Sequence, residues 1–340
     1  MTQKTLSDET FRHILHEQII KLCHSFELPL HWNKIGPKKF TNYQRAGIIV
    51  LFLRSKKSLR DFIRELKESR WTSWLGLKSL PGKSTLHDWQ TIFDLKTLRL
   101  FQEILLCKEK PSLMAIDATG IDSWQRSRHY EKRMFEALEP YERLKKMPYA
   151  KLDILIDVDS GLIHDFVLRI KPRHDTLGAK SMFKRMKHRG VKILADRRYD
   201  SEPLHKIAHQ AGNILYAKLR KMKKGIPGGF YRKKCMIKDP EYNRRCRVES
   251  VFNAIKHRRL IALRSKEPHM KKREIAWHIL IYNLEILQRI RQFILWLLKE
   301  PFRTSLISFL ALSKELYLTS FFQEGAFVLC SETLLVSIHQ

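Results

Sequence analysis

Alternating apolar and polar positions predict strands in the middle of the chain. The run YAKLDILIDV, a turn at 159–161 and the run LIHDFVLRI are together typical of an antiparallel hairpin. One face of the first run is apolar and is formed by Leu152, Ile154, Ile156 and Val158. Asp153 and Asp157 therefore lie on the opposite face, where we interpret them as solvated or paired strand residues and not as metal ligands.

Two further apolar runs each place an aspartate at the end of a predicted strand. The run Leu113–Ile116 leads to Asp117, and the run 191–195 leads to Asp196. An aspartate in such a position is more often a turn former or a helix cap, so neither one identifies a site by itself. The other elements predicted around the second strand are a crossover helix at about 176–188, a helix at 203–210 and a strand at 214–217.

The segment EYNRRCRVESVFNAIKHRR has the periodicity of a helix with two different sides. Its apolar side is formed by Val248, Val251, Phe252 and Ile255. At about 100° per residue, a polar stripe about 60° wide lies beside it and contains Tyr242, Arg245, Glu249 and Lys256. A carboxylate between cations suits metal binding beside a phosphodiester, provided that carboxylates from elsewhere share the cation. The alternative is a helix surface with ordinary ion pairs.

Short helices are predicted in the first 110 residues. Apolar residues at helical spacing indicate a helix at 46–53, and Ser58 caps the next one, with Asp61 three residues later. Another helix begins near Ser84. Short helices with tight polar links are typical of a helix-turn-helix DNA-binding module, and the alternative is a purely structural helical cap.

The charge of the chain indicates a polyanionic partner. With 65 Lys and Arg against 35 Asp and Glu, the formal net charge is +30. The segment Lys218–Lys234 carries eight basic residues and no acidic one, and we interpret it as a phosphate-binding insertion. Its alternative is a solvated basic face, whereas membrane binding fits less well because no long apolar span accompanies the charge. The predicted DNA contacts in and after this segment are Lys221, Lys223, Lys224, Arg258 and Arg259.

Length and cysteine usage set the remaining bounds. A chain of 340 residues with 44% hydrophobic content can hold two domains with cores of their own. The five cysteines show no paired metal-binding spacing, and the N-terminus lacks a signal-peptide pattern, so a reducing cytoplasm is expected. We predict a helical, helix-turn-helix-like DNA-binding domain at 1–110, a catalytic domain at 111–299 with a basic insertion near 218–240, and a C-terminal tail at 300–340.

The spacing Tyr, two residues, Arg, three residues, Glu, six residues, Lys resembles the signature of bacterial and archaeal DDE insertion-sequence transposases of groups four and five. All four positions match, and Asp117 and Asp196 resemble the first and second catalytic aspartates of that family. The resemblance implies an α/β fold with an RNase H-like mixed sheet, flanking helices and an N-terminal all-helical domain. Asp122 and Asp200 are alternatives to the two neighbouring aspartates.

The resemblance also implies a reaction. Asp117, Asp196 and Glu249 would be catalytic metal ligands for Mg²⁺, as two ions for which Mn²⁺ substitutes, while Tyr242, Arg245 and Lys256 would contact DNA. The partners would be the double-stranded terminal inverted repeats and target DNA, bound by a homodimer in the nucleoid. Two alternatives are a catalytically silent, transposase-derived DNA-binding regulator and an ordinary metal-dependent nuclease. The tail at 300–340 departs from the family pattern and is open to interpretation as a packing helix, an oligomerisation element or read-through from a decayed element.

Overall fold

The structure is a computed structural model, and it describes residues 11–12, 15–32, 38–122, 133, 136, 150–170, 175–219, 228–233, 240–259 and 262–299. The chain divides into two units, residues 1–286 and 287–340, and the first contains the sheet and the helices that flank it. The tail at 300–340 lies outside the described residues. Within the ranges given above, no helix is long and apolar enough to cross a membrane.

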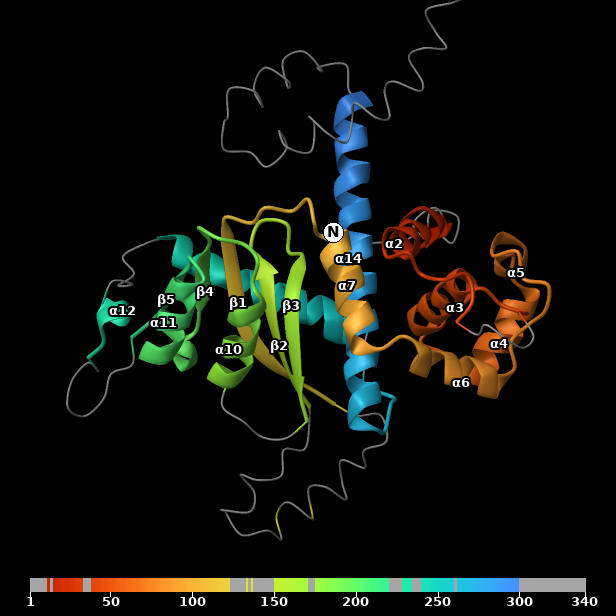
Figure 1. Cartoon of the computed structure of the whole chain (residues 1–340), viewed down its shortest axis with the longest axis horizontal. Coiled ribbons are helices and arrows are strands. Elements are labelled where there is room, and N and C mark those ends of the chain that lie inside the picture. Colours follow the sequence, from red (N-terminus) through yellow and green to blue (C-terminus); the bar gives the residue numbers. More distant parts are fainter. Residues whose placement is uncertain are drawn as a thin grey trace, which may run out of the picture. The chain divides into compact units, whose positions relative to one another are not determined.

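A five-stranded mixed sheet forms the centre of the first unit (Figure 1). Its strands lie in the order β3-β2-β1-β4-β5, with β1 antiparallel to β2, β2 antiparallel to β3, and β4 parallel to both β1 and β5. This arrangement confirms the predicted hairpin, the crossover into a parallel strand and the α/β, RNase H-like fold class. The bounds are β1 Leu113–Ile121, β2 Ala150–Asp157, β3 Ile163–Arg169, β4 Lys192–Ala195 and β5 Ile214–Ala217.

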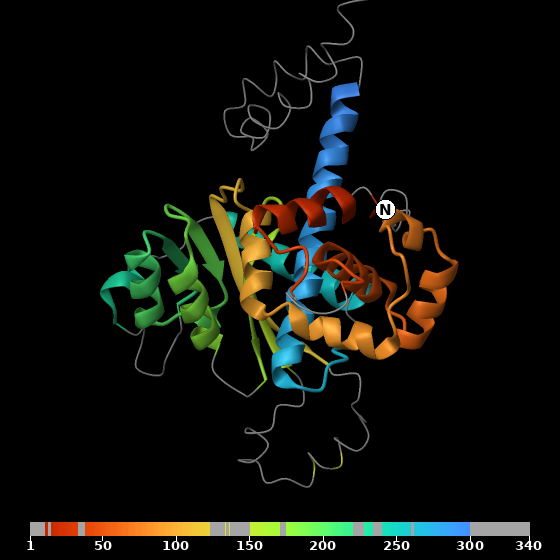
Figure 2. The ribbon, with the colours of Figure 1, turned by 45° about the vertical axis from the view of Figure 1, so that its right-hand side comes forward.

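Helices cover both faces of the sheet (Figure 2). Helices α10 (Asp175–Arg185) and α11 (Glu202–Gln210) bury one face in a core that includes Ile116, Leu155 and Ile193. Helices α7 (Leu95–Leu105), α13 (Arg247–Asn253) and α14 (Pro268–Lys299) contribute to the core on the other face. That second core contains the four alternating apolar residues of this segment, as predicted: Leu152, Ile154 and Ile156 of β2, and Val158 just after it.

Of the two interpretations of Asp153 and Asp157, solvated or paired, the structure shows the second. Both are buried, so they are paired residues and not solvated ones. Asp153 accepts two hydrogen bonds from Arg169, at 2.7 and 2.6 Å. Asp157 accepts from the backbone N–H groups of Asp159 and Ser160, each at 3.2 Å, and thereby closes the turn of the hairpin. The face is buried because α10 covers it, which the strand pattern alone did not indicate.

The N-terminal helices form where capping residues start them. Helix α3 begins after a capping box between Thr41 and Gln44, and α4 begins where Ser58 accepts the N–H of Asp61, as predicted. The predicted helix at 46–53 lies inside α3, and the helix predicted near Ser84 is α6. The bounds are α2 Ile20–Ser25, α3 Asn42–Ser55, α4 Leu59–Glu68, α5 Trp71–Trp74 and α6 Lys83–Ile92.

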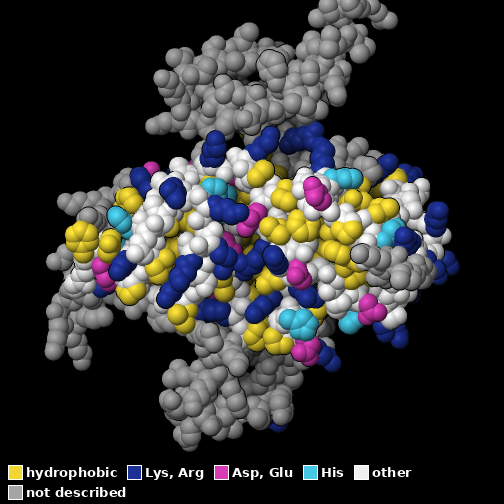
Figure 3. All heavy atoms as spheres, in the orientation of Figure 1, with side chains coloured by type: hydrophobic (Ala, Val, Ile, Leu, Met, Phe, Trp, Pro, Cys, Tyr) yellow, Lys and Arg dark blue, Asp and Glu magenta, His cyan; other side chains and the backbone are white. Residues whose placement is uncertain are grey.

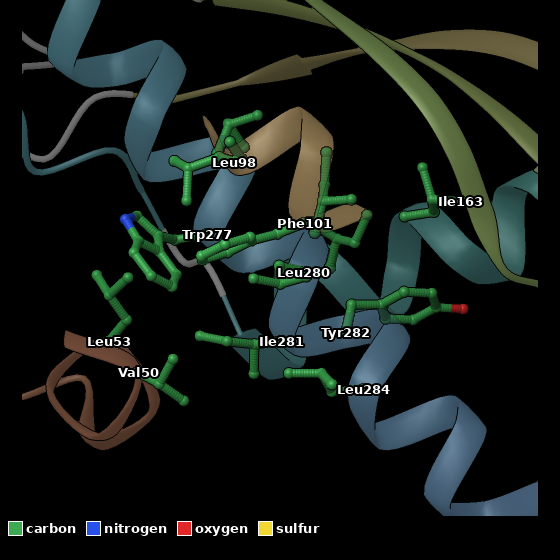
Figure 4. Close-up of a cluster of buried hydrophobic side chains, with 14 of the residues drawn as sticks. Val50, Leu53, Leu98, Phe101, Ile163, Trp277, Leu280, Ile281, Tyr282 and Leu284 are labelled. Carbon is green, nitrogen blue, oxygen red and sulfur yellow. The ribbon is translucent and has the colours of Figure 1, made fainter. Parts of the chain in front are cut away.

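Helix α14 joins the N-terminal helices to the sheet through one core. Its apolar side chains, among them Trp277, Leu280 and Ile281, gather with Leu53 of α3 and Phe101 of α7 (Figure 4). These residues are buried, and burying one large apolar side chain contributes about 1.5–3 kcal/mol. Because this core continues into the sheet, the N-terminal helices share it with the strands; the helix-turn-helix-like DNA-binding domain at 1–110 stays a prediction.

Two polar residues of α14 form hydrogen bonds to the hairpin of β2 and β3. The Tyr282 hydroxyl donates to the carbonyl of Gly161 at 3.0 Å. The Asn283 side chain pairs with the backbone of Ile163, accepting its N–H at 2.9 Å and donating to its carbonyl at 2.8 Å. These bonds satisfy the turn and the first residue of β3 inside the protein, where unpaired backbone groups are costly.

Candidate active site

The two predicted catalytic aspartates follow paired positions of neighbouring parallel strands. Ile116 of β1 lies opposite Ala195 of β4, and Asp117 and Asp196 are the next residues of the chain. Asp196 follows the end of β4, as predicted, whereas β1 continues to Ile121, so the predicted strand end at Asp117 is wrong. Adjacent strands lie about 4.8 Å apart, so Asp117 and Asp196 lie side by side where β4 ends. The strand register thus brings together two residues that are far apart in sequence.

Asp117 lies in a partly buried, charged environment. Its Oδ1 accepts the N–H of Ala118 at 2.8 Å, and its Oδ2 accepts from Nη1 of Arg245 at 3.1 Å. Burial raises the pKa of Asp117, and the negative charges of Asp196 and Glu249 raise it further, while the Ala118 bond and Arg245 lower it. Asp196 and Glu249 are therefore both close enough to Asp117 to influence it electrostatically.

The segment that carries Glu249 is helical, but it is not one regular helix. Residues Pro240–Cys246 form a 3₁₀ helix, α13 follows, and Ala254–Arg259 form a π-helical turn. In a 3₁₀ helix, residues three apart share a side, so Tyr242 and Arg245 both face the edge of the sheet. The predicted apolar side is confirmed, since all four of its members are buried: Val248, Val251, Phe252 and Ile255.

Glu249 lies at the open side of the site. Its side chain is 66% exposed, and its Oε1 lies 3.7 Å from Nη2 of Arg245. Arg245 therefore bridges Asp117 and Glu249. Within the described part of the chain, no three His, Cys, Asp or Glu side chains are close enough to one another to hold a metal ion. The residues nevertheless fit a divalent cation, because carboxylate oxygens are the ligands that Mg²⁺ prefers and the like charges that raise the pKa of Asp117 would be relieved by one.

Tyr242 is directed into the protein. It is 8% exposed, and its hydroxyl donates to the carbonyl of Ala195 at 2.9 Å. The ammonium of Lys218 lies 5.0 Å from the centroid of its ring, an arrangement typical of a cation–π contact. The Tyr242 hydroxyl is thus already engaged inside the protein. Its predicted contact with DNA stays a prediction, as do those of Arg245 and Lys256.

Lys256 lies on the π-helical turn and is partly buried. Burial lowers the pKa of its ammonium group, and the charge of Asp122 opposes that shift. Asp122, one of the two alternative carboxylates, is therefore close enough to act on the signature lysine.

The other alternative carboxylate, Asp200, belongs to a buried ion pair. It accepts from Nε of Arg232 at 2.8 Å and from Nη2 at 2.5 Å, and Nε2 of His205 lies 3.4 Å away. The sequence does not identify Arg232 as a partner of Asp200, since one arginine among eight basic residues of its segment carries no distinguishing signal. Arg232 belongs to helix α12 (Phe230–Lys233). Glu202 caps the N-terminus of this helix, because its carboxylate accepts the N–H of Tyr231 at 3.0 Å.

Five predicted DNA contacts have no described side chain. Lys221, Lys223 and Lys224 lie outside the described residues, and the structure describes only the backbone of Arg258 and Arg259. These five contacts remain predictions that rest on charge and on the resemblance.

Two comparisons with known proteins found similar proteins. Residues 108–284, just over half of the chain, match the family model described as "Transposase DDE domain". No curated protein matches the chain. Among solved structures, the chain is similar to piggyBac transposase in a cryo-EM synaptic complex with hairpin DNA, at 15% identity and a TM-score of 0.42, over 82% of this chain and 72% of that one. By the family match, this chain belongs to the DDE transposases.

Proposed function

We propose that this transposase cleaves DNA at the ends of an insertion sequence with the help of divalent metal ions and joins the freed 3′-hydroxyl to target DNA. The observation that carries the proposal is that Asp117 of β1 lies beside Asp196, which follows the adjacent parallel strand β4, and that Glu249 is linked to Asp117 through Arg245. Membership in insertion-sequence groups four and five rests on the four-residue signature.

The protein side chains divide the work by charge. Asp117, Asp196 and Glu249 would hold Mg²⁺, which supplies activation of the attacking oxygen and stabilisation of the leaving oxygen when it is bound. Arg245 balances the negative charge of Asp117 and Glu249, and its planar guanidinium also suits a phosphate. Lys256 supplies a second cation on the same helical segment.

DNA is the substrate that best fits the surface. Lys and Arg side chains spread over the face shown in Figure 3, with fewer acidic side chains among them. A net charge of +30 attracts phosphate backbones strongly and without regard to sequence. We propose that the double-stranded inverted repeats and the target DNA both bind this basic protein, and that a homodimer holds them.

The test is cleavage and joining of a labelled duplex that carries the element's own end, with Mg²⁺, Mn²⁺ or EDTA. The wild type is expected to nick the end with either metal and to give joined products, whereas Glu249→Ala gives neither. Glu103→Gln is the matched control, because Glu103 pairs with Lys187 at the surface at 2.6 Å and lies outside the carboxylate site.

Two results would change the proposal. Nicking without joined products would favour an ordinary metal-dependent nuclease. Binding of the end without cleavage under any metal would favour a catalytically silent DNA-binding regulator and would contradict the proposed reaction.

A further inference from the structure

Tyr242 is a residue of the catalytic signature whose only side-chain polar group is used inside the protein. We infer that Tyr242 is a positioning residue, which fixes the orientation of Asp196 through the backbone and does not bind DNA. This inference rests on the proposed function, since it concerns the geometry of one of the proposed metal ligands.

Tyr242 acts on the peptide bond between Ala195 and Asp196. The Tyr242 hydroxyl donates to the carbonyl oxygen of Ala195 at 2.9 Å, and this bond is buried. That oxygen belongs to the same planar unit as the N–H of Asp196. Holding the oxygen therefore restricts rotation of the plane from which the Asp196 side chain departs.

Strand β4 ends at Ala195, so Asp196 has no strand hydrogen bonds of its own to orient it. The carboxylate of Asp196 accepts the N–H of Arg197 at 2.7 Å, which fixes the side chain relative to the chain that follows. The bond from Tyr242 fixes the chain that precedes it. Both constraints together determine where the carboxylate points.

Contacts with residues of β4 and just after β5 hold Tyr242 in place. Its neighbour Glu241 pairs with Lys192, the first residue of β4, at 2.9 Å. Lys218, which follows β5, lies against the face of its ring. At 8% exposure the tyrosine has little surface left, and a phosphate could reach its hydroxyl only if the bond to Ala195 were broken.

The test compares Tyr242→Phe with wild type, because this change removes the hydroxyl and keeps the ring. Binding of Mn²⁺ to the full-length protein in complex with the end duplex is measured by electron paramagnetic resonance of the free ion. Residues that orient metal ligands typically cost about 10-fold or more in metal affinity when they are removed, so a loss of about 10-fold is expected. Duplex affinity, measured by fluorescence anisotropy in EDTA, is expected to stay within about twofold of wild type.

Tyr282→Phe is the matched control. It also removes a buried bond from a tyrosine hydroxyl to a backbone carbonyl, at Gly161, but its oxygen lies on the hairpin turn and not at the carboxylates. We expect a comparable loss of thermal stability with unchanged Mn²⁺ affinity.

Unchanged Mn²⁺ affinity in Tyr242→Phe, or an equal change in both variants, would overturn the positioning role. So would a loss of duplex affinity with normal Mn²⁺ binding, which is the result expected of a DNA contact. If wild type cleaves and Mn²⁺ affinity is unchanged in Tyr242→Phe, the proposed function stands and the inference fails. If Mn²⁺ affinity falls as expected but wild type does not cleave, the proposed function fails instead.

Discussion

Arg245 shows how one side chain can hold an acidic site together. It lies 3.1 Å from Asp117 and 3.7 Å from Glu249, and it partly offsets the repulsion between the carboxylates. A bound divalent cation would offset the same repulsion. The arginine and the cation should therefore be partly interchangeable as contributors to stability.

We expect Arg245→Ala to lower the free energy of unfolding by about 1 kcal/mol in EDTA, and by less in saturating Mg²⁺. Thermal unfolding in the two buffers would show this as a loss of about 2–4 °C in EDTA that shrinks when the metal is added. Arg244→Ala is the control, because Arg244 pairs with Asp159 and not with the proposed metal ligands. This variant should lose the same amount of stability in both buffers. Equal losses for both variants in both buffers would contradict the expectation.

The charge state of His164 affects how stability depends on pH. It lines a cavity of about 300 Å³ together with His188 and Asp165, and its Nε2 is buried without a hydrogen-bond partner among the described residues. Burial, assisted by His188, lowers the pKa of His164 to about 3. The folded protein therefore keeps this imidazole neutral, whereas the unfolded chain protonates it near pH 6.5.

Folding lowers the pKa of His164, so protonation of this histidine in the unfolded chain favours unfolding. The contribution of neutral His164 to the free energy of unfolding is therefore fully present above about pH 6.5 and is lost as the pH falls toward 3. We expect His164→Gln to flatten the decline in unfolding free energy between pH 6.5 and 5, where this histidine contributes at most about 1.4 kcal/mol per pH unit. The comparison is a series of urea denaturations with His87→Gln, an exposed histidine, as control. Parallel curves for wild type and His164→Gln would rule the effect out.

At the scale of elements, α10 packs on β2 with almost no space between them. A Cβ added at Gly178 would lie 2.6 Å from Oδ2 of Asp153, which Arg169 holds in place. Glycine inside a helix normally costs about 1 kcal/mol relative to alanine, so Gly178 is explained by this close approach.

A glycine-to-alanine substitution inside a helix usually raises the free energy of unfolding, and at Gly178 we expect it to lower that free energy. We expect Gly178→Ala to destabilise the protein by about 1–3 kcal/mol, because the new methyl group displaces Asp153 and strains its pair with Arg169. Chemical denaturation measures this loss. Gly228→Ala, where a Cβ would meet open space, should change the unfolding free energy little. A stabilised Gly178→Ala protein would show that α10 shifts away from β2 without cost.

Periodicity predicted the elements that carry the site but not the contacts that orient it. The apolar runs before Asp117 and Asp196 predicted the two strands, and Asp196 does follow the end of β4. The predicted strand end at Asp117 is wrong, because β1 stays paired with β2 as far as Ile121. The pattern around Glu249 identified the buried side of its helix. It did not show the 3₁₀ and π-helical turns or the inward direction of Tyr242, since a period of 3.6 assumes one uniform helix.

The partner of Asp200 was also beyond prediction from sequence. Arg232 comes from a basic segment that we interpreted as phosphate-binding, yet its guanidinium is buried against Asp200. Charge composition describes a segment as a whole and cannot distinguish the one cation that faces inward. Such pairs between distant segments become visible only when the fold places them together.

At the scale of the whole molecule, the net charge of +30 should dominate the energetics of DNA binding. Each phosphate contact contributes about −0.9 to the slope of log affinity against log salt concentration. We expect duplex affinity to fall by about 10³-fold or more between 50 and 200 mM salt, measured by anisotropy.

The same measurement tests the basic insertion. Substituting Lys221, Lys223 and Lys224 together by Gln should reduce the salt slope by about 3, if each residue contacts a phosphate. Lys187→Gln is the control, because that lysine is paired with Glu103. An unchanged slope in the triple variant would assign these lysines to a solvated face.

The position of Tyr282 and Asn283 in the chain has a consequence for synthesis on the ribosome. The hairpin to which they hydrogen-bond ends at Arg169, and the core to which α14 contributes includes residues of α3 and α7. More than a hundred residues must therefore be added before the first edge of the sheet is fastened, and apolar surface from α3 and α7 stays uncovered until then. Nascent chains that stop before α14 would expose this surface and be prone to aggregation, so synthesis through α14 is itself a condition for folding of the first unit.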